Sequence, residues 1–248
     1  MIRDPHARSA PGRLQLSCFE CQKRERSAWC GLTEGELGLL NRRKQCSEYR
    51  SGQVVFRQGD PFRGVFVVEQ GTLAVRKYDA LGNAILLKLV HQGDTLGYRD
   101  FLANQDYTTG ADALTESRLC LIATDAVREL LQRNPALGLG FIHRMAEDLE
   151  SAEQGLLRAS ALPIRARLAH LLLTLKDRYG AVDDSGVLRL DLPLARQDMA
   201  ALLGVRPETI TRTMHALEED GVVTFAGRAA AIPDLDLLLN EVESPERA

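Results

Sequence analysis

Residues 194–217 read LARQDMAALLGVRPETITRTMHAL, and this stretch predicts two short helices joined by a tight turn. Gly204 falls between the helices, where a residue without a Cβ atom permits the backbone conformation of a sharp turn. Pro207 stands in the first turn of the second helix, where its missing N–H removes no hydrogen bond. Apolar residues recur on the inner faces, at Met199, Leu202, Leu203, Val205, Ile210, Met214 and Leu217. The pattern is typical of a helix-turn-helix.

The second of these helices carries side chains that match the base edges of double-stranded DNA. Arg pairs with guanine N7 and O6, Glu accepts from cytosine N4, and the methyl group of Thr packs on that of thymine. The side chains expected on its exposed face are Arg206, Glu208, Thr209, Thr211, Arg212 and His215. An ordinary solvated helix hairpin is the alternative, because Glu and Arg three or four residues apart also form surface ion pairs. Two β-prone pieces around Gly227 fit a wing and favour DNA binding.

Residues 52–122 have the pattern of a small antiparallel β-barrel or jelly roll. Glycines that supply positive φ angles at tight turns separate short β-prone runs. The predicted strands are Val54–Phe56, Val65–Glu69, Leu73–Tyr78, Ile85–Val90 and Arg118–Ile122. Strands at such regular spacing are typical of closed or two-layered antiparallel folds. A short helix is expected before them, over Leu32–Asn41, with Thr33 as its N-cap.

A long helix with a narrow apolar stripe is expected after Asp125. Its apolar residues recur at steps of three and four, at Leu137, Phe141, Met145, Leu149, Ala152, Leu156 and Ala159. A stripe of this kind is typical of a seam between two parallel helices. The sequence therefore predicts a homodimer whose interface includes Phe141, Met145, Leu149, Ala152 and Leu156. A helix that packs on its own barrel is the alternative.

The chain is thus expected to be an α+β protein in four parts. These are an N-terminal cysteine-bearing segment (1–46), a β-barrel sensor domain (47–130), a dimerisation helix (131–160) and a winged helix-turn-helix domain (161–248). The last part is expected to begin with a helix over Ile164–Tyr179, set off by Pro163, and a strand over Val187–Leu192.

Composition and motifs exclude several classes of protein. The formal net charge is −3, so a surface that attracts DNA must be local. No apolar run approaches the roughly 18 residues of a membrane span, and the polar start MIRDPHARSAPGR does not resemble a secretory signal, so a cytoplasmic protein with no membrane partner is expected. There is no GxSxG, HExxH or phosphate-loop motif, and the five histidines are scattered, so we do not expect an enzyme.

The barrel, the long helix and the winged helix-turn-helix with the motif PETITR together resemble the superfamily of the cyclic-AMP receptor protein and the fumarate-nitrate regulator (CRP/FNR). The resemblance covers residues 18–235. It implies a dimeric transcription regulator that binds double-stranded DNA and works with RNA polymerase. The helix-turn-helix is then the DNA-binding part and the barrel the sensor.

The resemblance also assigns roles within the helix-turn-helix. Arg196 and Gln197 would contact phosphates, whereas Glu208, Thr211 and Arg212 would read bases. The fumarate-nitrate branch has Ser at the position of Thr211, and Thr keeps the hydroxyl group while adding a methyl group. A TTGAT-like half-site in an inverted repeat is therefore the expected target.

The sequence disfavours cyclic AMP as the ligand of the barrel. In the cyclic-nucleotide branch, an arginine pairs with the cyclic phosphate about ten residues after a Gly-Glu pair. This chain has Gly93–Gly97 and then Tyr107–Ala111, without that arginine. A buried phosphate would therefore be poorly paired.

The cysteines point to a metal centre, since an odd count of five fits a disulfide framework poorly. Cys18, Cys21 and Cys30 precede the barrel, and Cys120 lies on a late strand. Four thiolates with a two-residue gap suit an iron-sulfur cluster or zinc. Cys120 occupies the strand position of the fourth ligand in the oxygen-sensing fumarate-nitrate regulators, so the resemblance implies a [4Fe-4S] cluster that oxygen destroys. The gap between Cys21 and Cys30 is longer than is usual in that branch, but the loop can still close because the entropic cost of closure rises slowly with loop length.

Other interpretations of the cysteines remain open. Cys46 fits a small buried apolar residue, but it could replace Cys120 as a ligand. A zinc site and a thiol redox switch between two of the cysteines are alternatives to the cluster. A haem pocket for nitric oxide or carbon monoxide is another, with His91, His143 or a cysteine as its axial ligand.

Overall fold

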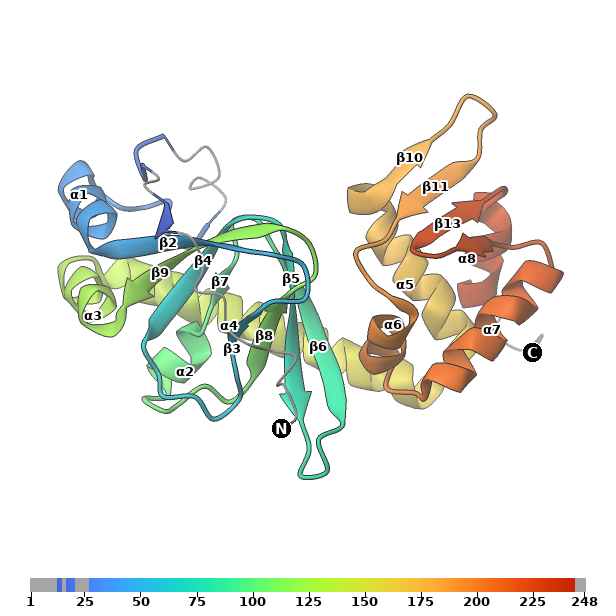
Figure 1. The fold of residues 1–248 in the computed structure, drawn as a ribbon, viewed down its shortest axis with the longest axis horizontal. Coiled ribbons are helices and arrows are strands. Elements are labelled where there is room, and N and C mark those ends of the chain that lie inside the picture. Colours follow the sequence, from blue (N-terminus) through green and yellow to red (C-terminus); the bar gives the residue numbers. More distant parts are fainter. Residues whose placement is uncertain (1–12, 15–16, 21–26, 244–248) are drawn as a thin grey trace, which may run out of the picture. The chain divides into compact units, whose positions relative to one another are not determined.

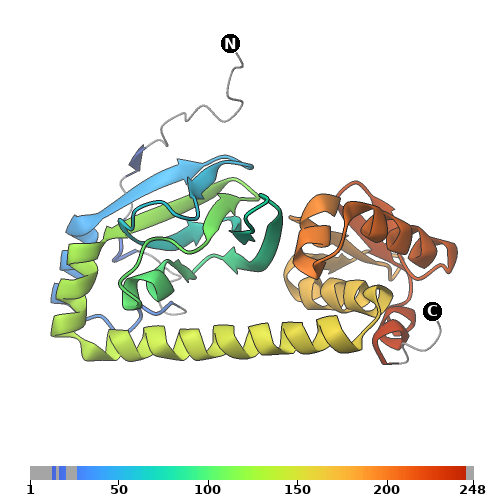
Figure 2. The ribbon, with the colours of Figure 1, turned by 90° about the horizontal axis from the view of Figure 1, so that it is seen from below.

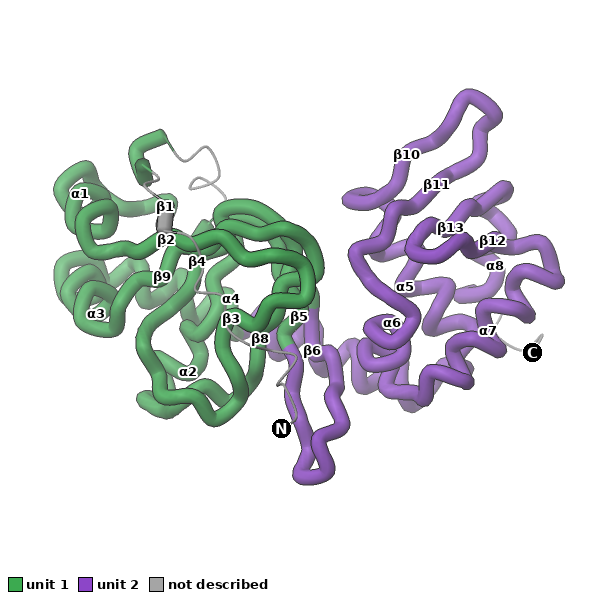
Figure 3. The backbone as a smooth tube through the Cα atoms, in the orientation of Figure 1, with its two compact units in different colours: residues 1–75, 89–145 green, residues 76–88, 146–248 purple. Residues whose placement is uncertain are grey.

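The computed structural model describes residues 13–14, 17–20 and 27–243. It divides into two compact units, one formed by residues 1–75 with 89–145 and the other by residues 76–88 with 146–248 (Figure 3). Among the described residues, no helix is long and apolar enough to serve as a membrane span.

Two antiparallel sheets form the barrel, as the glycine-separated strands predict (Figure 1). The first sheet has the order β1-β2-β9-β4-β7, with β1 Arg13–Leu14, β2 Lys44–Tyr49, β9 Ser117–Ala123, β4 Gly64–Gln70 and β7 Thr95–Leu96. The second has the order β3-β8-β5-β6, with β3 Val54–Phe56, β8 Gly110–Ala113, β5 Thr72–Tyr78 and β6 Ala84–His91. All five predicted strands are confirmed. Four strands, β1, β2, β7 and β8, have no counterpart in the sequence pattern, because their apolar residues are few or the strand is very short.

The first sheet is buried on both faces, because its side chains alternate between two cores. Phe66, Val68 and Leu119 point between the two sheets, into a core that the second sheet completes. Val65 and Ile122 point the other way, into a core formed with helices. This second core is covered by α1 Glu34–Arg43, α3 Thr124–Arg133 and the start of α4 Pro135–Ala161. In Figure 2, α4 runs along the lower side of the barrel, and α1 and α3 lie at its left end.

The helix α1 begins where the sequence predicts, at the N-cap Thr33. The Thr33 hydroxyl group accepts from the Glu36 backbone N–H, and the Glu36 carboxylate accepts from the Thr33 N–H at 2.8 Å. The Thr33 backbone hydrogen bond, with further hydrogen bonds from the side chains of Asn134 and Thr33, lowers the pKa of Glu36. Asn134 donates to Glu36 at 3.1 Å and separates α3 from α4, so this capping box also fixes the start of the long helix.

One predicted interface residue is buried in its own subunit. Phe141 has no exposed surface and packs in the helix-covered core, so it has none to offer a partner. Leu137, the first residue of the predicted stripe, is buried there too. Exposed apolar side chains instead follow steps of three and four from Ile142 onward, at Ile142, Met145, Leu149, Ala152 and Leu156. The sequence pattern could not separate the residues of the core from those of the surface stripe, since both recur at helical spacing.

The second unit contains the predicted helix-turn-helix and wing. After the end of α4, its elements are α5 Ile164–Tyr179, β10 Gly180–Val182, β11 Leu188–Asp191, α6 Arg196–Leu203, α7 Pro207–Glu219, β12 Thr224–Ala226, β13 Ala229–Ile232 and α8 Leu235–Glu243. Gly204 ends α6 in the left-handed conformation with φ 65°, and Pro207 begins α7. The sheet order is β10-β11-β13-β12, and the turn between its last two strands contains Gly227. The Arg165 guanidinium joins α5 to α8 and to the end of α7 through Glu241 and Asp220, each at 2.6 Å.

The first prediction concerns the close approach of β4 and β9 at Gly64. A Cβ atom there would lie 2.1 Å from the Ile122 carbonyl oxygen, whereas one at Gly59 would meet nothing within 4 Å. Both glycines have positive φ, 153° at Gly64 and 84° at Gly59, so the two alanine substitutions share a backbone cost of at least about 1–2 kcal/mol. Gly64→Ala is expected to lower the free energy of unfolding by about 3 kcal/mol or more, and Gly59→Ala by the shared cost alone. Urea denaturation measures both, and equal losses would contradict this packing.

Candidate functional site

The helix α7 is fixed by its inner face and leaves its other side free for a ligand. Ile210, Met214 and Leu217 have no exposed surface, and the buried Thr213 hydroxyl group donates to the Thr209 carbonyl at 2.9 Å. Because these residues recur at steps of three and four, the side chains between them point outward. The orientation of α7 about its own axis is therefore set by packing.

The outward side of α7 carries the predicted base-reading groups. Arg206, Glu208, Arg212 and His215 are exposed, while Thr209 and Thr211 are half-buried. The Thr211 hydroxyl group donates to the Pro207 carbonyl at 3.0 Å, which holds the Thr211 side chain in place. This surface combines two guanidinium groups, a carboxylate and a threonine methyl group, the groups that distinguish base pairs in the major groove.

The start of α6 carries the predicted phosphate contacts. Gln197 is exposed and Arg196 is half-buried, both in the first turn of the helix. The Asp198 carboxylate accepts from the Ala195 backbone N–H at 2.9 Å and closes this end of the helix. No DNA contact was predicted in the wing, where Arg228 is exposed in the turn between β12 and β13. The position of this basic residue beside the turn glycine Gly227 could have predicted a DNA contact in the wing.

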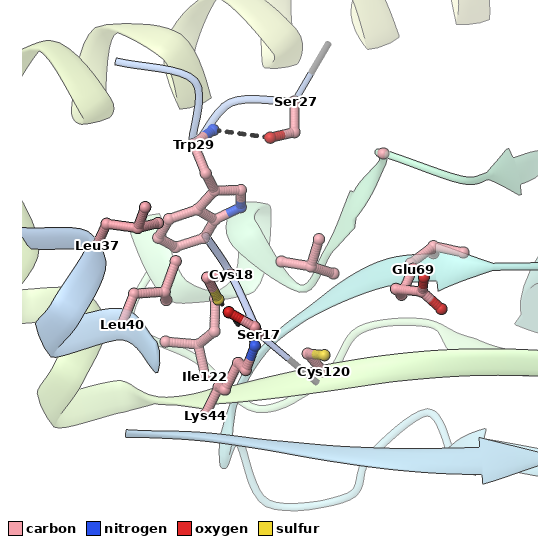
Figure 4. Close-up of a pocket in the computed structure, with 13 residues that line it drawn as sticks. Ser17, Cys18, Ser27, Trp29, Leu37, Leu40, Lys44, Glu69, Cys120 and Ile122 are labelled. Atoms are coloured by element: carbon pink, nitrogen blue, oxygen red, sulfur yellow. Dashed lines mark hydrogen bonds between the residues drawn. The ribbon is translucent and has the colours of Figure 1, made fainter. Parts of the chain in front are cut away.

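The cysteine-bearing segment and the barrel share one pocket. Cys18 and Cys120 both line it, together with Trp29, Lys44 and Val67, and Figure 4 shows the two sulfur atoms in this region. The Lys44 ammonium group donates to the Cys18 sulfur at 2.9 Å, and the Cys18 backbone N–H donates to Asn41 at 2.9 Å. The structure thus brings two of the four predicted ligands, far apart in sequence, to the same cavity.

Of the other two predicted ligands, the structure describes only Cys30. Cys30 is a free, exposed thiol next to Trp29 in the sequence. Cys21 lies outside the described residues. Within the part of the chain that the structure describes, no group of three or more His, Cys, Asp or Glu side chains is arranged to hold a metal ion. The proposed haem ligands are also apart, with His143 exposed on α4 and His91 at the end of β6.

The fifth cysteine, Cys46, was expected to be a small buried apolar residue or a ligand in place of Cys120, and it is instead paired with Cys120. Cys46 on β2 and Cys120 on β9 are joined by a disulfide bond. They are directly opposite in the antiparallel ladder, with their Cα atoms 3.9 Å apart. Spacing along the chain gave no sign of this pairing, because it depends on the register of β2, a strand that was not predicted. In this state the Cys120 sulfur is not a thiolate and cannot ligate iron.

Trp29 connects the cysteine-bearing segment to the barrel and to the long helix. Its indole N–H donates to the Thr95 hydroxyl group on β7 at 3.0 Å. Its ring packs edge-on against Phe141 in α4, with the ring centroids 5.6 Å apart. Trp29 is only 2% exposed. A change in the cysteine-bearing segment therefore reaches α4 through a direct side-chain contact.

Aromatic side chains fill the part of the barrel near the turn where the sequence lacks the phosphate-binding arginine. Tyr107 stacks on Phe56 with the ring centroids 4.1 Å apart, and its ring also packs against Phe62, with the ring centroids 4.9 Å apart. Its hydroxyl group donates to the Gly64 carbonyl at 2.7 Å, and burial raises the pKa of Tyr107 to about 12. The buried Asp100 carboxylate accepts from the Thr108 hydroxyl group at 2.6 Å. A buried carboxylate at this turn disfavours an anionic ligand such as a cyclic nucleotide.

Known proteins resemble both units. Family models match residues 46–134 as a cyclic nucleotide-binding domain and residues 166–241 as a Crp-like helix-turn-helix domain. The transcriptional activator protein FnrL of Cereibacter sphaeroides is 27% identical, over 90% of this chain and 91% of its own length. The anaerobic regulatory protein of Pasteurella multocida is 26% identical, over 92% of this chain and 83% of its own.

The fold has a solved counterpart in the c-di-GMP responsive global regulator CLP of Xanthomonas campestris. The TM-score is 0.73 at 19% identity, over 82% of this chain and all of that one. At this identity the match concerns the fold alone. The relatives matched by sequence are transcription regulators and not enzymes. The chain belongs to the CRP/FNR family of DNA-binding transcription regulators.

Proposed function

We propose that this regulator senses oxygen or redox state through a [4Fe-4S] cluster held by Cys18, Cys21, Cys30 and Cys120. The observation that carries the proposal is the pocket shared by Cys18 and Cys120, since it joins the N-terminal segment to the barrel. The names of the relatives give further support, because one of them is an anaerobic regulatory protein. When bound, an iron-sulfur cluster supplies a centre that oxygen or nitric oxide can attack.

Two of the four proposed donors, Cys18 and Cys120, suit such a cluster once the Cys46–Cys120 bond is reduced. Cys18 and Cys30 are free thiols, and reduction gives Cys120 a thiolate at the pocket that Cys18 also lines. The apolar side chains of Leu37, Leu40 and Ile122 line the same pocket and keep bulk water from it. Four thiols also suit zinc, and the presence or absence of sulfide separates these two candidates.

The same residues provide a path from the cysteines to DNA affinity. Ligands drawn from both the N-terminal segment and β9 would hold Trp29 against Phe141, and hence hold the start of α4. Loss of the centre would free the segment and change the packing of α4. We infer that the dimer, and through it the spacing of two recognition helices, responds to the state of the cysteines.

The exposed stripe on α4 supports the proposed dimer. Ile142, Met145, Leu149, Ala152 and Leu156 follow the three-four spacing of a parallel two-helix seam. Leu149 and Leu156 are 61% and 69% exposed in the isolated chain. Exposing this apolar surface to water is unfavourable, and a partner helix that covers it would remove that cost. A symmetric dimer would present two copies of α7, matching an inverted repeat.

On DNA, the proposed roles follow the exposure of each side chain. Glu208, Thr211 and Arg212 would read bases of a TTGAT-like half-site, with Arg206 and Thr209 beside them. Arg196 and Gln197 would contact the phosphate backbone. The family resemblance supports RNA polymerase as the protein partner at the promoter.

Cluster binding is tested by substituting each cysteine separately. Anaerobically purified wild-type protein is expected to contain four iron and four acid-labile sulfide per subunit. Cys18→Ser, Cys21→Ser, Cys30→Ser and Cys120→Ser should each lose both, because each removes one ligand. Cys46→Ser is the matched control and should keep them. Stoichiometric zinc without sulfide would rule out the oxygen-sensing proposal, and a requirement for Cys46 in place of Cys120 would refute the ligand set.

The dimer seam is tested with Leu149→Glu, which places two like charges opposite each other along the helix pair. Leu157→Glu is the control, because Leu157 is 59% exposed and lies one position beyond the stripe residue Leu156. Sedimentation is expected to show monomers for Leu149→Glu alone, with weaker binding to an inverted repeat. A Leu149→Glu protein that stays dimeric with unchanged DNA affinity would mean that the seam is assigned to the wrong residues.

Base reading is tested by comparing three arginines. Arg212→Ala is expected to cost about 1–3 kcal/mol on the specific site and to relax the preference for one G·C pair. Arg196→Ala should weaken binding to all sequences alike and reduce the salt dependence. Arg178→Ala, at an exposed position on α5, controls for loss of charge. Equal losses for Arg212→Ala on specific and random DNA would move Arg212 to the phosphate contacts.

A further inference from the structure

We propose that Cys46 and Cys120 form a reversible thiol–disulfide switch that decides whether the cysteine pocket can take up its metal centre. The inference rests on the function proposed above for Cys120, and it adds a role for Cys46, which that function does not use. The two sulfur atoms are bonded in the structure. Cys18 and Cys30, the other described cysteines, are free.

The strand ladder holds the two thiols together in either redox state. β2 and β9 pair over six consecutive residues, from Lys44 opposite Ile122 to Tyr49 opposite Ser117. Directly opposite residues of an antiparallel pair point to the same face. This ladder consists of backbone hydrogen bonds and persists without the disulfide. The reduced thiols are therefore neighbours, and the bond can form again without a change of fold.

The two cysteines differ in their access to reagents. Cys120 lines the pocket and is 8% exposed, whereas Cys46 is 2% exposed and does not line it. A small oxidant that enters the pocket meets Cys120 first. Access through the pocket also means that bound iron and the oxidant compete for the same sulfur atom.

The reaction is a thiol–disulfide exchange with a low-molecular-weight disulfide such as oxidised glutathione. The Cys120 thiolate attacks one glutathione sulfur, the glutathione disulfide bond breaks, and one glutathione leaves as its thiolate. The Cys46 thiolate then attacks the Cys120 sulfur and releases the second glutathione. The two cysteine sulfurs lose two electrons in total, the oxidised glutathione gains them, and the two protons end on the released thiols.

The consequence is mutual exclusion between disulfide and ligand. An iron-sulfur cluster takes thiolates, and a sulfur within a disulfide has no thiolate to offer. Oxidation of the Cys46–Cys120 pair thus removes one predicted ligand without touching the N-terminal cysteines. Reduction restores that ligand, so the thiol redox state of the cell would control assembly of the centre and not only its destruction.

The first experiment isolates the pair from the other cysteines. Cys18, Cys21 and Cys30 are all replaced by Ser, which leaves only Cys46 and Cys120 of the five. After oxidised glutathione is added without oxygen, the subunit is expected to lose the mass of two hydrogen atoms and both alkylatable thiols. It should remain monomeric on a non-reducing denaturing gel. The same protein with Cys46→Ser should not lose the two hydrogen atoms and should stop at a mixed disulfide between Cys120 and glutathione, because the second thiol is missing. A stable glutathione adduct on the protein that keeps Cys46, or an intersubunit disulfide, would overturn the switch.

The second experiment uses the full chain and measures iron and sulfide uptake after pretreatment. The oxidant level is chosen so that peptide mapping finds the Cys46–Cys120 bond alone. Reduced wild-type protein should take up iron and sulfide, oxidised wild-type protein at least tenfold less, and re-reduced protein the original amount. In Cys46→Ser the internal bond cannot form, so loading should fall only in the fraction of subunits whose Cys120 carries glutathione by mass spectrometry. If oxidised wild-type protein loads fully, or Cys46→Ser subunits with unmodified Cys120 lose loading to the same extent, the switch is refuted. If reduced wild-type protein takes up no cluster, the proposed function fails instead, while the first experiment still decides whether the pair is reversible.

Discussion

The indole of Trp29 packs against Phe141 and donates a hydrogen bond to Thr95, and this contact joins three parts of the first unit. Trp29 belongs to the cysteine-bearing segment, Thr95 to the first sheet and Phe141 to the start of α4. Removing a fully buried aromatic side chain typically costs about 3–5 kcal/mol. The segment, the sheet and the start of the long helix therefore form one packed body, and none can shift without disturbing the others.

The first sheet, which accepts the Trp29 hydrogen bond, also carries the two bonded cysteines. Cys46, Cys120, Val67 and Thr95 are successive cross-strand partners over β2, β9, β4 and β7. Cross-strand partners share one face of a sheet, so the disulfide lies in the same row as the hydrogen-bond acceptor of Trp29. Chemistry at these sulfurs is thereby linked, through one row of side chains, to the contact that holds α4.

Residues with a strong local signal could be predicted from sequence. The turn at Gly204, the start of α7 at Pro207 and the N-cap at Thr33 each depend on one residue and its near neighbours, and the structure confirms them. Phe141 and the Cys46–Cys120 pair depend on contacts between distant segments. Helical periodicity cannot tell a residue that packs on its own barrel from one that meets a partner, and cysteine spacing cannot reveal strand register.

The central claim is that the state of the cysteines sets DNA affinity through Trp29 and α4. It is tested most directly by measuring the affinity of one anaerobic, iron-loaded preparation for a TTGAT-like inverted repeat, before and after exposure to air. The account predicts that affinity falls by about 5- to 150-fold as iron is lost, the range typical of coupling between two sites. An unchanged affinity after complete loss of iron would contradict it.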